Sequence, residues 1–362
     1  MRDKRYSELV HILGKKIELE SSNGVDVIVK QIPDLDEKGV LDPRVKEIIT
    51  NPKEEMQNKS SGFIYNGIPV GDMRAGMGWD NIDIAPRGIS TKYKKIKGKN
   101  RMINVRIYTP RDAENKLPCM IFFHGGGFFG GSLDVVENPC KAIANKAKAV
   151  VISVDYALAP ESKFPKGFED CFDIVEWAYS NPEEINIDKD KICVSGDSAG
   201  GNLSIACSIK DRELKTNMIK YQALLYPVVI FAEEGVEGYK WDINQYEVNK
   251  DEHIITACIN GLRNTKDILY LYLEEGENLE NPYLSPLFLK DFSNLPKTLI
   301  VTAEYDFLRI QGEVFGKKLT EAGVDTRIIR YRGMDHAFID KCGIYPQAED
   351  CFNEIAKDII SL

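Results

Sequence analysis

Short apolar runs that alternate with helical periods restrict the possible folds of this chain more than any other feature. From about residue 92 the apolar runs lie at 119–123, 150–154, 192–194, 221–229, 298–302 and 326–331. Segments with helical periodicity lie between or after them, at 139–148, 168–179, 201–210, 311–322 and 348–360. Strands that are apolar along their whole length and are joined by amphipathic helices form a parallel sheet covered on both faces. We therefore predict an α/β fold with a mostly parallel central sheet flanked by helices.

Two segments fall outside this alternation and divide the chain into predicted units. Residues 1–90 precede it, and residues 232–280 interrupt it with charged and aromatic side chains. Insertions into such sheets usually lie over the carboxyl ends of the strands, where ligands bind. We expect an N-terminal cap segment at 1–90, a catalytic domain at 91–231 and 281–362, and a cap insertion at 232–280. An unrelated or mobile arm is the alternative for residues 1–60.

Length and charge indicate one enlarged domain whose main partner is not a nucleic acid. The chain has 362 residues and a net charge of −9, so it has no basic excess to neutralise phosphates. A local basic stretch, 92–101, lies where strand-like runs at 93–96 and 103–108 predict an antiparallel hairpin. We interpret that stretch as a solvated turn rather than a binding patch.

Cysteine usage and the lack of long apolar runs indicate a cytoplasmic protein. The eight cysteines are scattered, several of them in apolar runs, and no Cys-x-x-Cys pair occurs. Buried free thiols in a reducing compartment explain this pattern better than disulfides or a zinc site. The first residues lead into a polar segment without the apolar core of a secretory signal, and no run reaches the ~20 apolar residues of a membrane span.

The segment Gly196-Asp197-Ser198-Ala199-Gly200-Gly201 predicts a nucleophile. It follows the apolar run 191–195 and precedes a helical period. A Gly-x-Ser-x-Gly segment between a strand and a helix holds its serine on a sharp turn, where glycines avoid collisions with neighbouring backbone. The Ser198 hydroxyl then lies at the tip, where a substrate carbonyl can reach it. The pentapeptide alone is a weak signal, so its value depends on partners elsewhere in the chain.

The predicted base for Ser198 is His336. A serine needs a base because an alcohol is scarcely ionised near neutral pH, and imidazole suits the role because its ordinary pKa is ~6.5. Among the four histidines, His336 follows the run 326–331, on a loop at the same edge of the sheet as Ser198. His11 and His253 lie in the predicted cap segments without such a context.

The predicted acid is Asp306, which would accept the second imidazole N–H and stabilise the imidazolium. Asp306 follows the run 298–302 and again lies at the carboxyl end of a strand. Asp335 and Glu304 compete for this role, and Asp306 could instead cap a helix at 307–322. We favour Asp306, because neighbouring loop residues such as Asp335 and His336 rarely direct their side chains at one another.

The glycine-rich segment 124–131 predicts donors for the oxyanion that develops during acyl transfer. Glycines let backbone amides approach a substrate, and we expect the N–H groups of Gly126, Gly127 and Ala199 to form the oxyanion hole. A phosphate-binding loop is the alternative, but the segment lacks a Gly-Lys-Ser/Thr ending and the context that Gly-x-Gly-x-x-Gly requires. For His124 we expect a structural hydrogen bond within this loop.

Together these residues resemble the hormone-sensitive-lipase-like carboxylesterase branch of the α/β-hydrolase superfamily, with its HGGG and GDSAG motifs. The resemblance covers about residues 92–362, and further matches are Asp155-Tyr156-Ala157-Leu158-Ala159-Pro160-Glu161, Phe164-Pro165, Ser285-Pro286-Leu287 and Gly196 through Asn202. It implies an α/β-hydrolase fold with a helical cap. It also implies a carboxylesterase that needs no cofactor or metal and prefers short to medium acyl chains.

The chain departs from that family after the predicted triad aspartate. The usual pattern is Asp-Pro-Leu-Arg-Asp-Glu, whereas this chain has Asp306-Phe307-Leu308-Arg309-Ile310-Gln311. In the family, the first of the two replaced carboxylates commonly lies near the histidine. We therefore hypothesise that His336 is held less strongly here and that Ile310→Asp raises kcat.

The sequence thus predicts a serine carboxylesterase that hydrolyses short- to medium-chain esters through a Ser-His-Asp triad and an acyl-enzyme. An amidase or deacetylase acting on aryl-amide or acetylated small molecules is the alternative reaction, since it passes through the same tetrahedral oxyanion. A non-catalytic small-molecule receptor on the same fold is the alternative class. The expected partner is a small-molecule ester, and the oligomeric state is left open, with a homodimer as one option.

Aromatic side chains near the predicted site indicate an apolar pocket. Phe128, Phe129 and Phe338 are the predicted lining residues, together with lid aromatics such as Phe231, which directly precedes the cap insertion, and Tyr239 within it. Packing in the core is the alternative for each of them.

Overall fold

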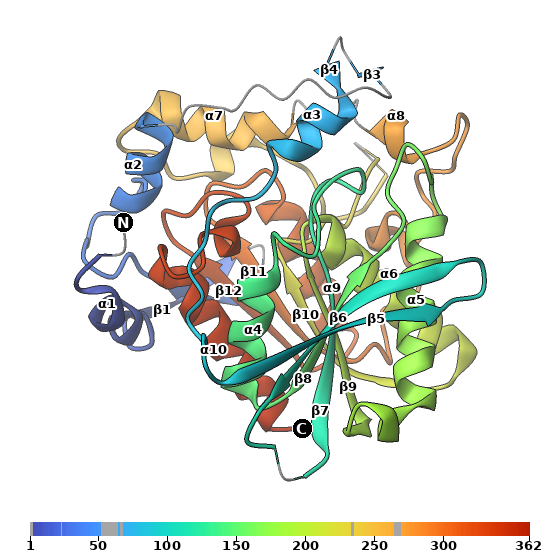
Figure 1. The fold of residues 1–362 in the computed structure, drawn as a ribbon. Helices are drawn as coiled ribbons and strands as arrows, with labels where there is room; N and C mark the ends of the chain where they lie inside the picture. The colour runs from blue at the N-terminus through green and yellow to red at the C-terminus, as the bar shows by residue number, and fades with distance from the viewer. Residues whose placement is uncertain are drawn as a thin grey trace.

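A computed structural model describes residues 3–22, 24–51, 64–65, 68–113, 115–232, 235–263 and 269–362. Its centre is a twisted sheet crossed by helices on both sides (Figure 1). The strands of this sheet are β1 (Ile17–Ser22), β2 (Val25–Lys30), β5 (Ile89–Lys97), β6 (Met102–Pro110), β7 (Leu117–Phe123), β8 (Val150–Asp155), β9 (Ile187–Asp197), β10 (Ile219–Leu225), β11 (Lys297–Ala303) and β12 (Thr326–Tyr331).

The order of strands in the sheet is β1-β2-β12-β11-β10-β9-β7-β8-β6-β5. The seven strands from β2 to β8 in this order run parallel, whereas β1, β5 and β6 are antiparallel to their neighbours. The prediction of a mostly parallel α/β sheet is therefore confirmed. The carboxyl ends of the parallel strands all meet at one edge, which is where Ser198 and His336 follow β9 and β12.

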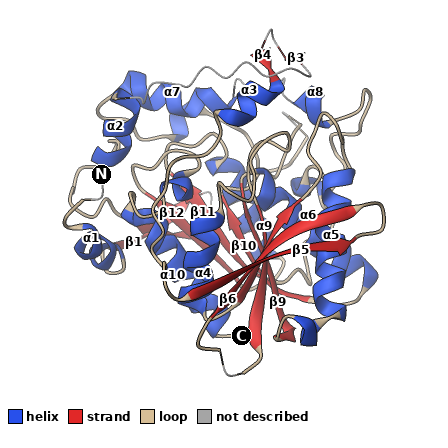
Figure 2. Ribbon diagram, in the orientation of Figure 1, coloured by secondary structure: helices blue, strands red, loops and turns tan. Residues whose placement is uncertain are grey.

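Helices cover both faces of the sheet (Figure 2). Arg330 donates from β12 to Glu313, whereas the next residue, Tyr331, donates its hydroxyl to Asp350 on the opposite face. Successive side chains of a strand point to opposite faces, so the helices that carry these two acids lie on opposite sides. The flanking helices are α4 (Glu137–Ala147) and α10 (Pro346–Ile360) on one face, and α5 (Lys166–Ser180), α6 (Ala199–Leu214) and α9 (Arg309–Glu321) on the other.

The predicted strand at 221–229 has different bounds in the structure, since β10 begins at Ile219 and ends at Leu225. The strand stops because Tyr226 has a φ of 36° and Pro227 has no N–H to donate to the ladder. The apolar residues beyond it leave the sheet, and Val228 and Ile230 line the cavity described below.

The basic stretch 92–101 forms the hairpin that its pattern predicts. β5 and β6 are antiparallel, with Lys97 opposite Met102. Lys99 and Arg101 form ion pairs with Glu176 and Asp170, and the Arg101 pair has an N–O distance of 2.7 Å. These cations are therefore already paired with carboxylates of the same chain.

The N-terminal segment differs from its prediction as a cap, because β1 and β2 extend the central sheet next to β12. Val27 and Val29 are fully buried, and α1 (Tyr6–Leu13) packs against α10. Lys30, only 1% exposed, lies between Asp350 and Glu354 of α10, with N–O distances of 3.0 and 2.8 Å. Residues 6–30 thus belong with the sheet, since their apolar strand needs a covered face.

The remaining parts of both predicted cap segments lie along one side of the molecule (Figure 1). They contain α2 (Pro43–Thr50), β3 (Ile64–Tyr65), β4 (Ile68–Pro69), α3 (Val70–Ala75), η2 (Ile243–Gln245), α7 (Glu252–Arg263) and α8 (Leu269–Tyr272). An ion pair of 2.8 Å between Lys46 and Asp251 joins the two segments. Residues 1–2, 23, 52–63, 66–67, 233–234 and 264–268 of the predicted segments lie outside the described residues.

Two further findings bear on the sequence analysis. All eight cysteines are free, and seven of them are buried, as their positions in apolar runs indicate. Within the ranges given above, no helix is both long enough and apolar enough to cross a membrane.

Candidate active site

Ser198 lies on a sharp turn between the end of β9 and the start of α6. Its φ is 55°, a left-handed value that strains a residue with a side chain. The flanking glycines are required, because a Cβ on Gly196 would lie 2.4 Å from the backbone of Gly200, and one on Gly200 would lie 1.9 Å from the carbonyl oxygen of Phe123. The serine is 7% exposed, and it lines the cavity. This is the elbow geometry that the sequence predicts.

The structure brings Ser198, His336 and Asp306 together. The Nε2 atom of His336 lies 3.0 Å from the hydroxyl oxygen of Ser198, and its Nδ1 atom lies 2.7 Å from Oδ2 of Asp306. The protonated Nδ1 therefore donates to Asp306, which leaves Nε2 as the acceptor for the serine proton. Both distances are within hydrogen-bond range.

The two competing carboxylates have other contacts. Glu304 accepts a hydrogen bond of 2.7 Å from the N–H of Gly333 and lies 3.7 Å from Arg332. It therefore supports the start of the loop that carries His336. Asp335 makes no hydrogen bond to the imidazole, whose two nitrogen contacts are those described above. The alternative role of Asp306 as the cap of the next helix is wrong, because the N-cap of α9 is Leu308; the Oδ1 atom of Asp306 instead accepts a 2.9 Å bond from the N–H of Leu308, within the turn before the helix.

The charges around His336 favour its protonated form. Burial by itself lowers the pKa of the imidazole, but the charge and hydrogen bond of Asp306 outweigh burial, and Asp197 and Asp335 act in the same direction. The net result is a raised pKa. Burial and the nearby carboxylate of Asp340 raise the pKa of Asp197 well above its ordinary value.

The predicted oxyanion loop approaches Ser198 through its backbone. Gly126 and Gly127 line the cavity with Ser198 and have φ values of 121° and 59°. No hydrogen bond among the described residues uses the N–H groups of Gly126, Gly127 or Ala199, so they are free to donate to a substrate oxygen. Asp197 holds this loop to the elbow, since its Oδ1 atom accepts a 2.8 Å bond from the N–H of Gly125. No motif signal marks this role of Asp197 in the sequence apart from its place directly before the serine.

His124 has the contacts of a structural residue. Its Nδ1 atom lies 2.8 Å from the carbonyl oxygen of Gly125, and its ring stacks on Tyr156 with a centroid distance of 4.4 Å. Burial lowers the pKa of this histidine, so its ring is neutral.

A cavity of about 690 Å³ opens beside Ser198. Phe128 and Phe129 line it, as predicted, together with Phe231, just before the second cap segment, and Tyr239 within that segment. Further lining residues that the sequence did not signal include Met77, Trp241 and Phe307. Phe307 directly follows Asp306, but nothing in its local pattern distinguishes a cavity-lining side chain from one in the core.

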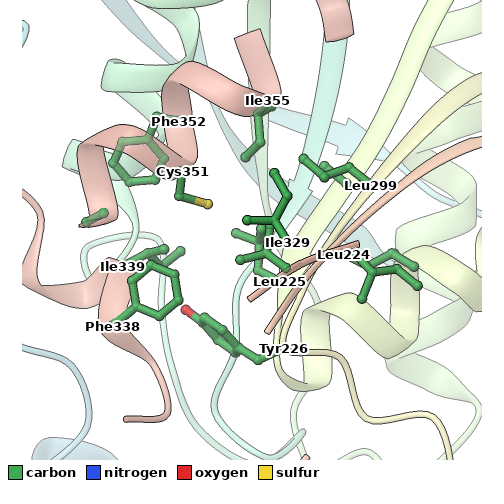
Figure 3. Packing of buried hydrophobic residues seen from close by; sticks show 14 of the residues in the cluster. Leu224, Leu225, Tyr226, Leu299, Ile329, Phe338, Ile339, Cys351, Phe352 and Ile355 are labelled. Carbon is green, nitrogen blue, oxygen red and sulfur yellow. The ribbon is translucent and has the colours of Figure 1, made fainter. Parts of the chain in front are cut away.

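The prediction for Phe338 is wrong. This side chain is fully buried and lies beside Tyr226 in the core (Figure 3), with a ring distance of 5.5 Å. Its other ring contact is Tyr331, at 5.1 Å. Ala337 has a φ of 59°, and this turn begins the short helix η5 (Phe338–Lys341) with Phe338 directed into the core.

The two residues that replace the family carboxylates have separate roles. Gln311 is buried, and its side-chain oxygen accepts bonds of 2.7 and 3.2 Å from the N–H groups of Val229 and Ile230. It thereby supports the backbone of the cavity wall. Ile310 is 2% exposed and packs in the apolar core.

The fold and this site are those of a serine hydrolase with a nucleophile elbow. A match to the alpha/beta hydrolase fold family covers residues 120–340, and the chain belongs to this family, in its hormone-sensitive-lipase-like branch.

Its relatives define the reaction class. The chain is 37% identical over 269 residues to an arylesterase of Saccharolobus solfataricus. This alignment covers 74% of this chain and 83% of that protein. It is 31% identical over 252 residues to carboxylesterase NlhH of Mycobacterium tuberculosis, covering 68% and 75%. The solved structure of a hyperthermophilic esterase from the archaeon Pyrobaculum calidifontis is similar with a TM-score of 0.66 and 36% identity, covering 75% of this chain and 85% of that one. The chain is a carboxylic ester hydrolase.

Proposed function

We propose that the protein hydrolyses carboxylic esters by double displacement at Ser198. The Ser198 hydroxyl attacks the ester carbonyl while Nε2 of His336 takes its proton, and Asp306 stabilises the imidazolium. His336 then protonates the leaving alcohol, which departs from an acyl-enzyme. A water molecule that gives a proton to the same imidazole attacks the acyl group, and the imidazolium then returns this proton to the Ser198 oxygen as the acid is released. The N–H groups of Gly126, Gly127 and Ala199 stabilise the oxyanion of both tetrahedral intermediates.

The observation that carries this proposal is the position of His336 between its two partners. One imidazole nitrogen lies 3.0 Å from the Ser198 hydroxyl, and the other lies 2.7 Å from the Asp306 carboxylate. A nucleophile in hydrogen-bond contact with a base, which in turn is oriented by a third group, is the arrangement that activates an alcohol.

The size and lining of the cavity support the proposal that the substrates have short to medium acyl chains. Its volume of about 690 Å³ and its aromatic lining suit an apolar acyl or aryl group. We propose that residues 232–280, together with the part of the N-terminal segment near Met77, form the cap that limits the length of this group. The cytoplasmic location stays a prediction from the sequence.

The test compares Ser198→Ala with Ser195→Ala. Ser195 is a buried serine near the end of β9, three residues before Ser198, and its hydroxyl donates to the carbonyl of Ala223 at 2.8 Å. We expect Ser198→Ala to lose at least ~10⁴-fold in kcat on p-nitrophenyl butyrate, while Ser195→Ala stays active. A fluorophosphonate probe should label the wild-type protein and the control, but not Ser198→Ala. Wild-type rates in Ser198→Ala would refute the assignment.

A substrate panel separates the reaction classes. We expect hydrolysis of p-nitrophenyl esters to fall from butyrate to palmitate, as the chain outgrows the cavity. An aryl acetamide should react far more slowly than the matched aryl acetate. A faster reaction with the amide would favour the amidase alternative.

A further inference from the structure

Three consecutive residues of the cap insertion are hydrogen-bonded to the turn that carries Asp306. The hydroxyl of Tyr246 donates to the backbone carbonyl of Asp306 at 2.9 Å. On either side of Tyr246, the carbonyl of Gln245 accepts a bond of 2.6 Å from Arg309, and the carbonyl of Glu247 accepts one of 3.0 Å from the hydroxyl of Tyr305. All three residues of the cap segment 245–247 therefore contact the turn 305–309.

Of the three contacts, only that of Tyr246 is made to Asp306 itself. The side chain of Tyr246 is 5% exposed, and burial raises its pKa, so the hydroxyl keeps its proton and acts as a donor. The guanidinium of Arg309 lies 4.3 Å from the centre of its ring, a cation–π contact that fixes the ring from one side. Trp241 packs against the same ring at 6.4 Å.

Asp306 lies in the turn between β11, which ends at Ala303, and α9, which begins at Arg309. Backbone bonds from the N–H groups of Glu304 and Tyr305 hold the start of this turn, and the carbonyl of Asp306 also accepts a 3.1 Å bond from the N–H of Arg309. The bond from Tyr246 is therefore a second, side-chain support of the same carbonyl. The orientation of the Asp306 carboxylate follows from that of its own backbone. Catalytic groups must be held within about 0.5 Å of the productive geometry, and a displacement of ~1 Å can cost about 100-fold in rate.

We propose that Tyr246 is a positioning residue through which the cap insertion holds the carboxylate of Asp306 against His336. The proposal rests on the proposed function, because it assumes that Asp306 is the triad acid. It gives the cap a role beyond enclosing substrate. Trp241 lines the cavity and packs on both Tyr246 and Phe307, so the wall that meets the substrate and the support of the acid form one packed unit.

The test is Tyr246→Phe, with Tyr305→Phe as the matched control. Each substitution removes one hydroxyl that bonds the cap to this turn, but only that of Tyr246 bonds Asp306 itself. We expect Tyr246→Phe to lower kcat by roughly 5- to 20-fold on p-nitrophenyl butyrate, with KM within about twofold. We expect Tyr305→Phe to keep kcat within about twofold, with a similar change in Tm.

The pH profile separates positioning from a loss of folded protein. The carboxylates of Asp306, Asp197, Asp335 and Asp340 all interact with His336. When Asp306 moves away, the pKa of His336 falls, and the acid limb of kcat/KM shifts to lower pH. A purely structural defect would lower the rate at every pH without moving this limb.

Three outcomes decide the proposal. A lower kcat with a shifted acid limb in Tyr246→Phe alone supports it. Equal kcat values in the two variants, or a loss without a shifted limb, overturn it. If Tyr246→Phe does not fold, Arg309→Lys gives a second test, because the shorter side chain loses the hydrogen bond to Gln245 and the stacking on Tyr246 while it keeps the charge, and the same shift in smaller measure is expected. Activity of Ser198→Ala would refute the proposed function itself, which separates the two failures.

Discussion

Replacing Gly126 with alanine should disable the oxyanion hole while leaving the triad in place. The φ of Gly126 is +121°, and a Cβ there would lie 2.3 Å from the carbonyl carbon and oxygen of Gly130. Ordinary contacts of this kind are longer than about 3.4 Å, so the loop must move by ~1 Å. The neighbouring atoms are backbone, and no side chain can yield.

The magnitude follows from the donor that such a shift removes. Loss of one oxyanion donor costs about 10²- to 10³-fold in kcat, or roughly 3–4 kcal/mol. The forced backbone conformation should cost a further ~1–3 kcal/mol in the free energy of unfolding. We therefore expect Gly126→Ala to lose about 10²- to 10³-fold in kcat and to unfold at lower urea concentration.

Gly323→Ala is the control for backbone strain alone. Gly323 has a φ of +80°, but no atom lies within 4 Å of the place that a Cβ would take, and the residue lies far from Ser198 in sequence. It should lose ~1–2 kcal/mol of stability with kcat unchanged. The assay is steady-state hydrolysis of p-nitrophenyl acetate alongside urea unfolding of all three proteins. A kcat of Gly126→Ala within threefold of wild type would refute the assignment of the oxyanion hole.

Three further predictions test the acid, the altered motif and the N-terminal strands. The pKa of His336 is raised above its ordinary value of ~6.5. As the pH is lowered, kcat/KM should therefore begin to fall while the pH is still above ~6.5, since only the neutral imidazole is a base. Asp306→Asn should lower kcat by ~10⁴-fold and move this limb to lower pH, and an unmoved limb in the pH–rate profile would contradict the assignment. Ile310→Asp should lose about 3 kcal/mol or more of stability because it buries a carboxylate in the core, so kcat should not rise; faster turnover at unchanged stability would instead restore the hypothesis from the sequence. Lys30→Met should cost about 3–5 kcal/mol at pH 7 by leaving Glu354 without its buried partner, as urea unfolding can measure. Burial alone would raise the pKa of Glu354, but the hydrogen bonds and charges of Lys30 and Lys357 together lower it to about 2. The share of this stabilisation that Lys30 supplies is present above pH ~4.5 and is lost as the pH falls toward 2; an equal difference between the two proteins at pH 7 and pH 2 would contradict this linkage.

The sequence alone determined the features that depend on local chemistry. The glycines around Ser198 mark a turn in which a larger residue would collide with neighbouring backbone. The apolar runs before Asp306 and His336 mark strands that end a few residues before these two side chains. Parallel strands place their carboxyl ends at one edge, so the convergence of these three residues could be predicted without coordinates.

Only the tertiary structure decided which side chains meet across long separations in the sequence. Phe338 turns into the core because of the φ of Ala337, and Tyr246 reaches the carbonyl of Asp306 from a cap segment 60 residues away. The N-terminal strand β2 joins the sheet beside β12, about 300 positions further along the chain. Such contacts arise from packing between whole elements, and they leave no periodic or motif signal in the residues that make them.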